Sequence, residues 1–158
     1  MYIKIITIGK IKTDFWNQAI KEYATRLSRF VKVDDEILND QREPKNLTPA
    51  LIEQIKKTEC EGILKKIKPE DFVICLAIEG KQLTSEQLAD FIAVKQNLSR
   101  PLVFIIGGSH GVSDAIYKRA DFLLSMSKMT FAHNLAKVIL YEQIYRAFSI
   151  INNTKYHK

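Results

Sequence analysis

The sequence has few cysteines and no long apolar run, and each of these absences excludes a class of protein. Two cysteines, Cys60 and Cys75, in 158 residues are too few for the disulfide framework of a small secreted protein, and they fit buried thiols in a reducing compartment. No apolar run approaches the roughly 18 residues that a membrane span needs. The opening MYIKIITIGK is not followed by the apolar stretch and small-residue cleavage site of a signal peptide. We therefore expect a cytoplasmic protein.

The sequence also lacks the short spacings that mark metal and nucleotide sites. The possible metal ligands are Cys60, Cys75, His110, His133 and His157. None of them are paired as zinc ligands are, so we expect no bound metal. The segment GGSHG has neither the G-x-G-x-x-G of dinucleotide-binding proteins nor the G-K-[ST] of P-loops, and its serine is outside a G-x-S-x-G motif.

Charge and length limit the remaining functions. Lys and Arg outnumber Asp and Glu by 24 to 18, which gives a net charge of +6. This balance permits a nucleic-acid partner without establishing one, because many basic proteins bind no nucleic acid. We expect residues 1–158 to form one domain, too short for separate catalytic and substrate-binding domains. Whatever recognises the substrate must then share the catalytic fold.

Short apolar, β-branched runs alternate with segments of helical periodicity. The predicted strands are residues 1–9, 31–38, 72–78, 102–106 and 122–124. The predicted helices begin near residues 13, 48, 84, 113 and 136. Thr48-Pro49 is typical of a helix start, and Thr84 with Gln87 forms a capping box. The β-α-β-α order predicts an α/β fold with a mostly parallel sheet and helices on both faces.

Three polar loops follow predicted strands, at residues 76–81, 107–111 and 126–131. Because the carboxyl ends of parallel strands meet at one edge of a sheet, we expect the loops to form a pocket. Gly107 and Gly108 let the backbone approach a ligand closely, and the third loop mixes apolar with polar side chains. Such walls suit an adenosine.

The last predicted helix, residues 136–151, carries apolar residues on more than one face. A domain of this size covers only part of that surface. One alternative is a helix buried wholly within its own domain, and the other is a helix at a two-fold interface. We predict a homodimer.

Several unusual segments occur in one order over essentially the whole chain: KIITIGKIK, FWNQAIKEYATRL, FVICLAIEGK, IIGGSHG, LSMSKMTFAH, LYEQIYRAFSI and a terminal YHK. In these segments the chain resembles the SPOUT-class RNA methyltransferases, most closely those that methylate a pseudouridine of large-subunit ribosomal RNA. The resemblance implies a deep C-terminal trefoil knot, which general topology rules do not predict. It also implies S-adenosylmethionine as cofactor, bound in a bent form, and the N3 atom of the pseudouridine as methyl acceptor.

The resemblance further implies roles for individual residues. The expected cofactor contacts are Leu76, Gly107, Gly108, Met126, Ser127, Lys128, Met129, Thr130 and Phe131. The expected catalytic candidates are His133, Tyr156 and His157, and the expected RNA contacts are Lys137, Arg146 and Lys158. Methyl transfer from a sulfonium needs alignment and removal of the acceptor proton rather than a metal or a covalent intermediate.

Two positions depart from the family pattern. Ala132 stands where the family usually has proline, and Lys137 stands where it usually has arginine. The first change implies a less rigid loop, and the second a cation without bidentate geometry. These departures leave open an alternative, in which the chain is a non-catalytic ribosome- or RNA-binding protein with the same fold.

Overall fold

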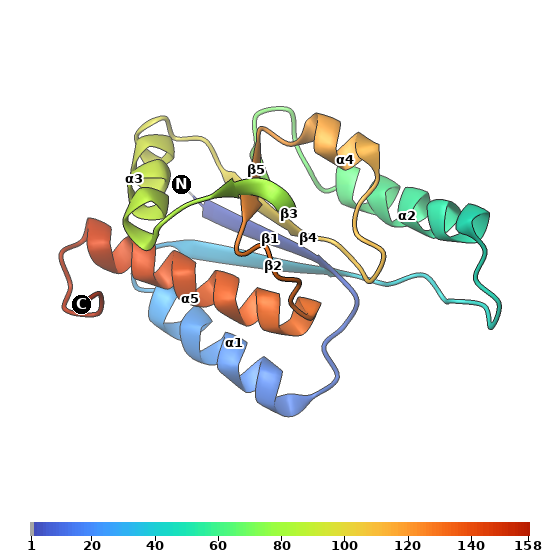
Figure 1. Ribbon diagram of the computed structural model, residues 1–158. Helices are drawn as coiled ribbons and strands as arrows, with labels where there is room; N and C mark the ends of the chain where they lie inside the picture. Colours follow the sequence, from blue (N-terminus) through green and yellow to red (C-terminus); the bar gives the residue numbers. More distant parts are fainter. Residues whose placement is uncertain (1) are drawn as a thin grey trace.

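A computed structural model describes residues 2–158, in which five strands alternate with five helices (Figure 1). The strands are β1 (Tyr2–Ile8), β2 (Lys32–Leu38), β3 (Phe72–Gln82), β4 (Leu102–Ile106) and β5 (Phe122–Ser125). The helices are α1 (Asp14–Leu27), α2 (Pro49–Leu64), α3 (Ser85–Asn97), α4 (Asp114–Arg119) and α5 (His133–Ile151). Within residues 2–158, no helix is both long and apolar enough to cross a membrane.

The strands form one sheet in the order β2-β1-β4-β3-β5, and every strand pair within residues 2–158 is parallel. Helices α1, α3 and α5 cover one face, and α2 and α4 cover the other (Figure 1). Side chains alternate between the two cores as the pleat requires, so that Ile74 faces the first core while Val73 and Cys75 face the second. The predicted α/β fold is confirmed.

Two of the predicted helix starts carry the expected caps. The Thr48 hydroxyl accepts a hydrogen bond from the Leu51 backbone N–H at 3.2 Å. Thr84 and Gln87 make both bonds of a capping box, at 3.1 and 2.9 Å. Helix α4 is different, because the backbone N–H of its preceding residue, Ser113, donates to the Cys60 sulfur instead. That bond ties the start of α4 to α2.

Strand β3 departs from its predicted end. It runs on to Gln82, four residues past the predicted strand, with a register shift between Leu76 and Lys81 where it pairs with β5. Gly80 makes this pairing possible, because a Cβ atom there would lie 2.7 Å from the Leu123 backbone carbonyl. Residues 76–81 are therefore an irregular strand rather than a loop.

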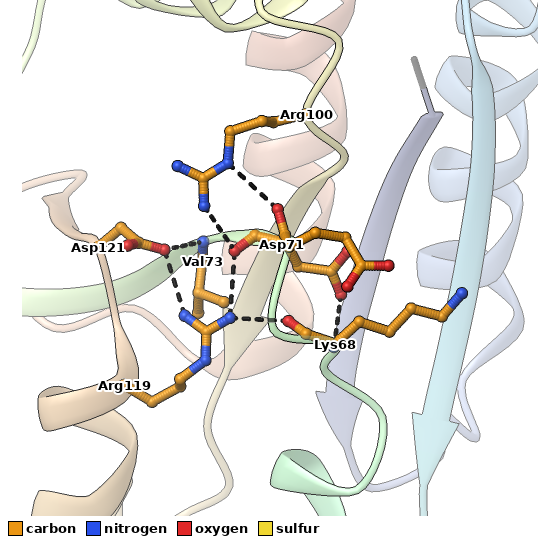
Figure 2. A network of polar contacts seen from close by, with 7 residues as sticks. Lys68, Asp71, Val73, Arg100, Arg119 and Asp121 are labelled. Atoms are coloured by element: carbon orange, nitrogen blue, oxygen red, sulfur yellow. Dashed lines mark hydrogen bonds and ion pairs between the residues drawn. The ribbon is translucent and has the colours of Figure 1, made fainter.

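A polar network holds the amino ends of β3 and β5 together, at the edge of the sheet opposite the glycine loop (Figure 2). The Asp121 carboxylate accepts a hydrogen bond from the Val73 backbone N–H at 2.8 Å and one from Arg119 at 3.3 Å. The Arg119 guanidinium also donates to the carbonyl oxygens of Lys68 at 2.9 Å and Asp71 at 3.1 Å. One guanidinium thus joins the segment before β5 to the loop before β3.

We expect Asp121→Ala to lower the free energy of unfolding by about 2 kcal/mol, since it leaves a strand N–H and a guanidinium donor without their acceptor. Urea denaturation measures the change. Asp90→Ala is the matched control, because Asp90 is exposed on α3 and should change the stability by less than about 0.5 kcal/mol. Equal effects of the two substitutions would contradict a structural role for the network.

Candidate functional site

A cavity of about 470 Å³ opens at the carboxyl edge of the sheet. Most of its wall comes from three places: the middle of β3, the loop after β4, and the segment from the end of β5 to the first turn of α5; Tyr117 of α4 completes the lining. Eight of the nine residues expected to contact a cofactor line this cavity. The exception is Lys128, which is exposed and lies outside the lining set. Three segments far apart in the sequence therefore converge on one site.

The glycine loop after β4 is a tight turn. The Gly111 backbone N–H donates to the Gly108 carbonyl oxygen at 3.0 Å, and Gly111 has a φ of +78°, which favours glycine. A Cβ atom at Gly107 would lie 2.8 Å from the Val112 side chain, and one at Gly108 would lie 3.1 Å from the Glu59 carboxylate. The two glycines thus permit the loop to pack closely against the side chains of Val112 and Glu59. The backbone of both glycines forms part of the cavity wall.

Hydrogen bonds within the third loop hold it in shape. The Ser125 hydroxyl donates to the Ser127 carbonyl oxygen, and the Ser127 hydroxyl accepts from the Met129 backbone N–H, both at 3.0 Å. Ala132 has a φ of −55°, within the range that a proline ring imposes. Ala132 therefore has the backbone conformation that the family's usual proline would adopt, although it lacks the proline ring.

His133, the first residue of α5, lines the cavity, whereas the other two catalytic candidates do not. Tyr156 and His157 follow the opposite end of α5, which has 19 residues and therefore a length of about 28 Å. The Tyr156 hydroxyl donates to Glu142 at 2.9 Å, and the His157 ring lies 2.8 Å from the Glu86 carboxylate. The chain does not bring its own tail to its own cavity.

The environment of the tail affects two pKa values. Burial, followed by the neighbouring Tyr23 and Glu142 side chains, raises the pKa of the Tyr156 phenol well above its ordinary value. A phenol in this position stays protonated at neutral pH. The backbone N–H of Glu86 itself, and then the His157 ring, lower the pKa of the Glu86 carboxyl to about 2. The carboxylate partner of His157 is therefore ionised at neutral pH.

The expected RNA contacts differ in their surroundings. Lys137 is only 1% exposed, and its amino group lies 2.7 Å from the Asp35 carboxylate on β2. It therefore joins α5 to the sheet edge, and its expected contact with RNA stays a prediction. Arg146 pairs with Glu142 at 3.0 Å, and its guanidinium lies over the Tyr156 ring. Lys158 is exposed at the end of the chain.

The chain is similar in sequence to known proteins over essentially its full length. A family model described as "Predicted SPOUT methyltransferase" matches residues 1–157. The chain belongs to the SPOUT methyltransferase family. Two relatives carry the name "Ribosomal RNA large subunit methyltransferase H", one from Ureaplasma urealyticum serovar 10 and one from Ureaplasma parvum serovar 3. They are 49% and 48% identical to this chain over 159 residues, and each alignment covers both proteins completely.

A solved structure has a fold similar to that of this chain. It is described as a probable methylase family protein from Haemophilus influenzae Rd KW20. Its TM-score is 0.54, over 99% of this chain and 70% of the other, at 13% identity. At that identity the likeness concerns the fold alone.

The cavity of this SPOUT protein fits the family's type of cofactor. Its volume lies within the range of small-molecule sites, and it combines apolar side chains with the backbone of two ordered loops. Leu76, Ile78 and Leu124 offer apolar surface for a purine ring, and the glycine loop offers backbone polar groups. No group of three His, Cys, Asp or Glu side chains within residues 2–158 is arranged to hold a metal ion.

Two residues near this site have roles that the loop pattern does not predict. One is Gly80, which lets β3 and β5 approach each other beside the cavity. The other is Glu59, which is buried on α2. A sequence signal for Glu59 exists, because it stands four residues from both Ile55 and Ile63 on the buried face of α2. A carboxylate in an apolar helical stripe indicates a buried charge.

Proposed function

We propose that the protein is an S-adenosylmethionine-dependent methyltransferase that acts on large-subunit ribosomal RNA. The observation that carries this proposal is the convergence of eight expected cofactor contacts on one cavity at the carboxyl edge of the sheet. The names of two full-length relatives support the choice of substrate. The net charge of +6 agrees with an RNA partner.

The chemistry proposed for the site is a direct methyl displacement. The bound cofactor would supply an activated methyl group on a sulfonium. The residues of the chain align the acceptor and keep water away, and alignment alone accounts for a large part of such an acceleration. His133 is well placed for the acceptor side, because it lines the cavity at the start of α5.

The proposed acceptor is the N3 atom of a pseudouridine, in an assembled ribosome in the cytoplasm. This finer assignment rests on the resemblance of the whole chain to enzymes of that specificity. We also propose that residues 1–158 form one domain, so that RNA recognition and catalysis share its surfaces. The exposed Lys158 remains a candidate for contact with a phosphate.

We further propose that the active form is a homodimer. Tyr156 and His157 lie at the end of α5 remote from the cavity of their own chain, so a second copy is the direct way to bring them to a site. One side of α5 carries the apolar residues Leu135, Val138 and Ile139, which are only partly buried. A second chain packed on this side would cover them.

The test uses ribosomes from a strain that lacks this gene. The purified protein, given these ribosomes and methyl-labelled S-adenosylmethionine, should transfer label to one nucleotide of large-subunit RNA, identified by mass spectrometry. Calorimetry should show cofactor binding, and sedimentation should show a dimer at micromolar concentration. A protein that binds ribosomes but neither cofactor nor label would instead be a non-catalytic binding protein.

A further inference from the structure

A second cavity, of about 390 Å³, adjoins the cofactor cavity. It lies between the end of β1, the segment after β2, helix α2 and the glycine loop. Gly108, Ser109 and His133 line both cavities. A ring in the second cavity would therefore lie next to a ligand in the first, with only the glycine loop and His133 at the boundary.

The buried charged side chain in this second cavity is Glu59. It is only 6% exposed and lines the cavity. Among residues 2–158, the one hydrogen bond to its carboxylate is a long one, 3.4 Å from the Gln41 backbone N–H, and no cation lies within ion-pair distance. A buried carboxylate without a close partner is costly. Such a group is free to accept a hydrogen bond from a ligand.

The charges around the second cavity are mixed. Asp40, Glu43 and Glu59 are acidic, whereas Lys10 and Arg42 are basic; His110 and His133 complete the titratable lining. His110 already lies 2.7 Å from Glu43. An excess of carboxylates disfavours a phosphate. The cavity therefore suits a neutral ring that offers N–H donors and carbonyl acceptors.

We propose that the second cavity receives the acceptor base and that Glu59 is a catalytic residue that removes its proton. This inference rests on the proposed function. The N3–H bond breaks and its proton passes to the Glu59 carboxylate. The electron pair on N3 forms the new bond to the methyl carbon, while the carbon–sulfur bond breaks and its electrons remain on sulfur as a neutral thioether. Atoms and charge balance without any other reactant.

The surroundings of Glu59 match this role. Burial raises the pKa of its carboxyl, the Gln41 N–H opposes that effect, and the nearby Asp40 and Glu43 raise the pKa further while His110 lowers it. A raised pKa makes the carboxylate a stronger base. The same group gives selectivity, because a uracil-type ring presents an N–H at position 3, whereas cytosine presents a lone pair that Glu59 would repel.

The test is single-turnover methylation of the gene-deleted ribosomes by Glu59→Gln. We expect the rate to fall at least about 100-fold, as for loss of a general base, while the Kd for S-adenosylmethionine changes less than about two-fold. Glu61→Gln is the matched control, since Glu61 is exposed on the same helix and should keep the wild-type rate. An inactive wild-type protein would refute the proposed function, whereas an active wild type with a fully active Glu59→Gln would refute this inference alone.

The pH profile separates chemistry from a purely structural role. The wild-type rate should fall as the pH is lowered through the pKa of Glu59, because protonation removes the base. Glu59→Gln should lose that acidic limb. If Glu59→Gln fails to fold, Glu59→Asp decides: a rate reduced more than about 10-fold with the acidic limb retained supports a positioned carboxylate base, and a full rate contradicts it.

Discussion

Deletion of Tyr156–Lys158 is expected to slow methylation of ribosomal RNA on the order of 100-fold, while the affinity for S-adenosylmethionine stays nearly unchanged. The tail contributes no lining residue to the cofactor cavity of its own chain. Its aromatic ring, imidazole and terminal lysine are nevertheless the groups that a proposed second copy would offer to the acceptor. Single-turnover rates on gene-deleted ribosomes, with calorimetry on the same preparations, measure both quantities.

Mixing two inactive variants shows whether the tail acts in the site of its own chain or in that of the partner chain. If the tail completes the partner's site, tail-deleted chains mixed with chains inactivated in their own cavity should regain activity, since each mixed dimer holds one complete site. Lys155→Ala is the control for a general charge effect, because Lys155 is exposed in the same segment. Full activity of the tail-deleted protein by itself would show that the tail is dispensable.

The second large effect is expected from Lys137→Met, which should lower the free energy of unfolding by about 3 kcal/mol. The substitution leaves the Asp35 carboxylate without the amino group that lies 2.7 Å away. Burial and this carboxylate also raise the pKa of the neighbouring Tyr141 phenol, so the phenol stays protonated. A protonated phenol is neutral and therefore does not supply the lost positive charge. Urea denaturation measures the loss.

A double variant separates the ion pair from the packing of the lysine stem. Lys137→Met combined with Asp35→Leu should lose clearly less stability than the sum of the single changes, because no unpaired carboxylate remains. The affinity of folded Lys137→Met for ribosomes should match that of the wild type. Weakened ribosome binding at unchanged stability would instead support the predicted contact of Lys137 with RNA.

Local sequence signals predict most of the fold. Strand β4 has its predicted limits, Leu102–Ile106, because it is buried on both faces and ends at glycines. The capping box at Thr84 is likewise a local signal. The end of β3 escapes prediction because it depends on the approach of Gly80 to Leu123, which are distant in sequence. Long-range contacts of this kind have no local pattern.

The place of the cofactor cavity can be predicted, because the carboxyl ends of parallel strands lie at one edge of a sheet. The partners of isolated buried charges cannot be predicted in this way. Lys137 and Glu59 both stand on the buried faces of their helices, where a sequence pattern marks a charge as unusual but does not name its partner. The partner of Lys137 is on β2, 102 residues away in sequence. The trefoil knot and the homodimer stay predictions.

The strand order also has a consequence for synthesis on the ribosome. β1 lies between β2 and β4, and β4 begins at Leu102. At about 5–20 residues per second, the edge of β1 that faces β4 therefore stays unpaired for on the order of ten seconds. The cofactor cavity forms later still, because β5 and the first turn of α5 complete its wall. A nascent chain can thus pair β1 with β2 before β4 is made, but its cofactor cavity is complete only after β5 and the first turn of α5 have been added.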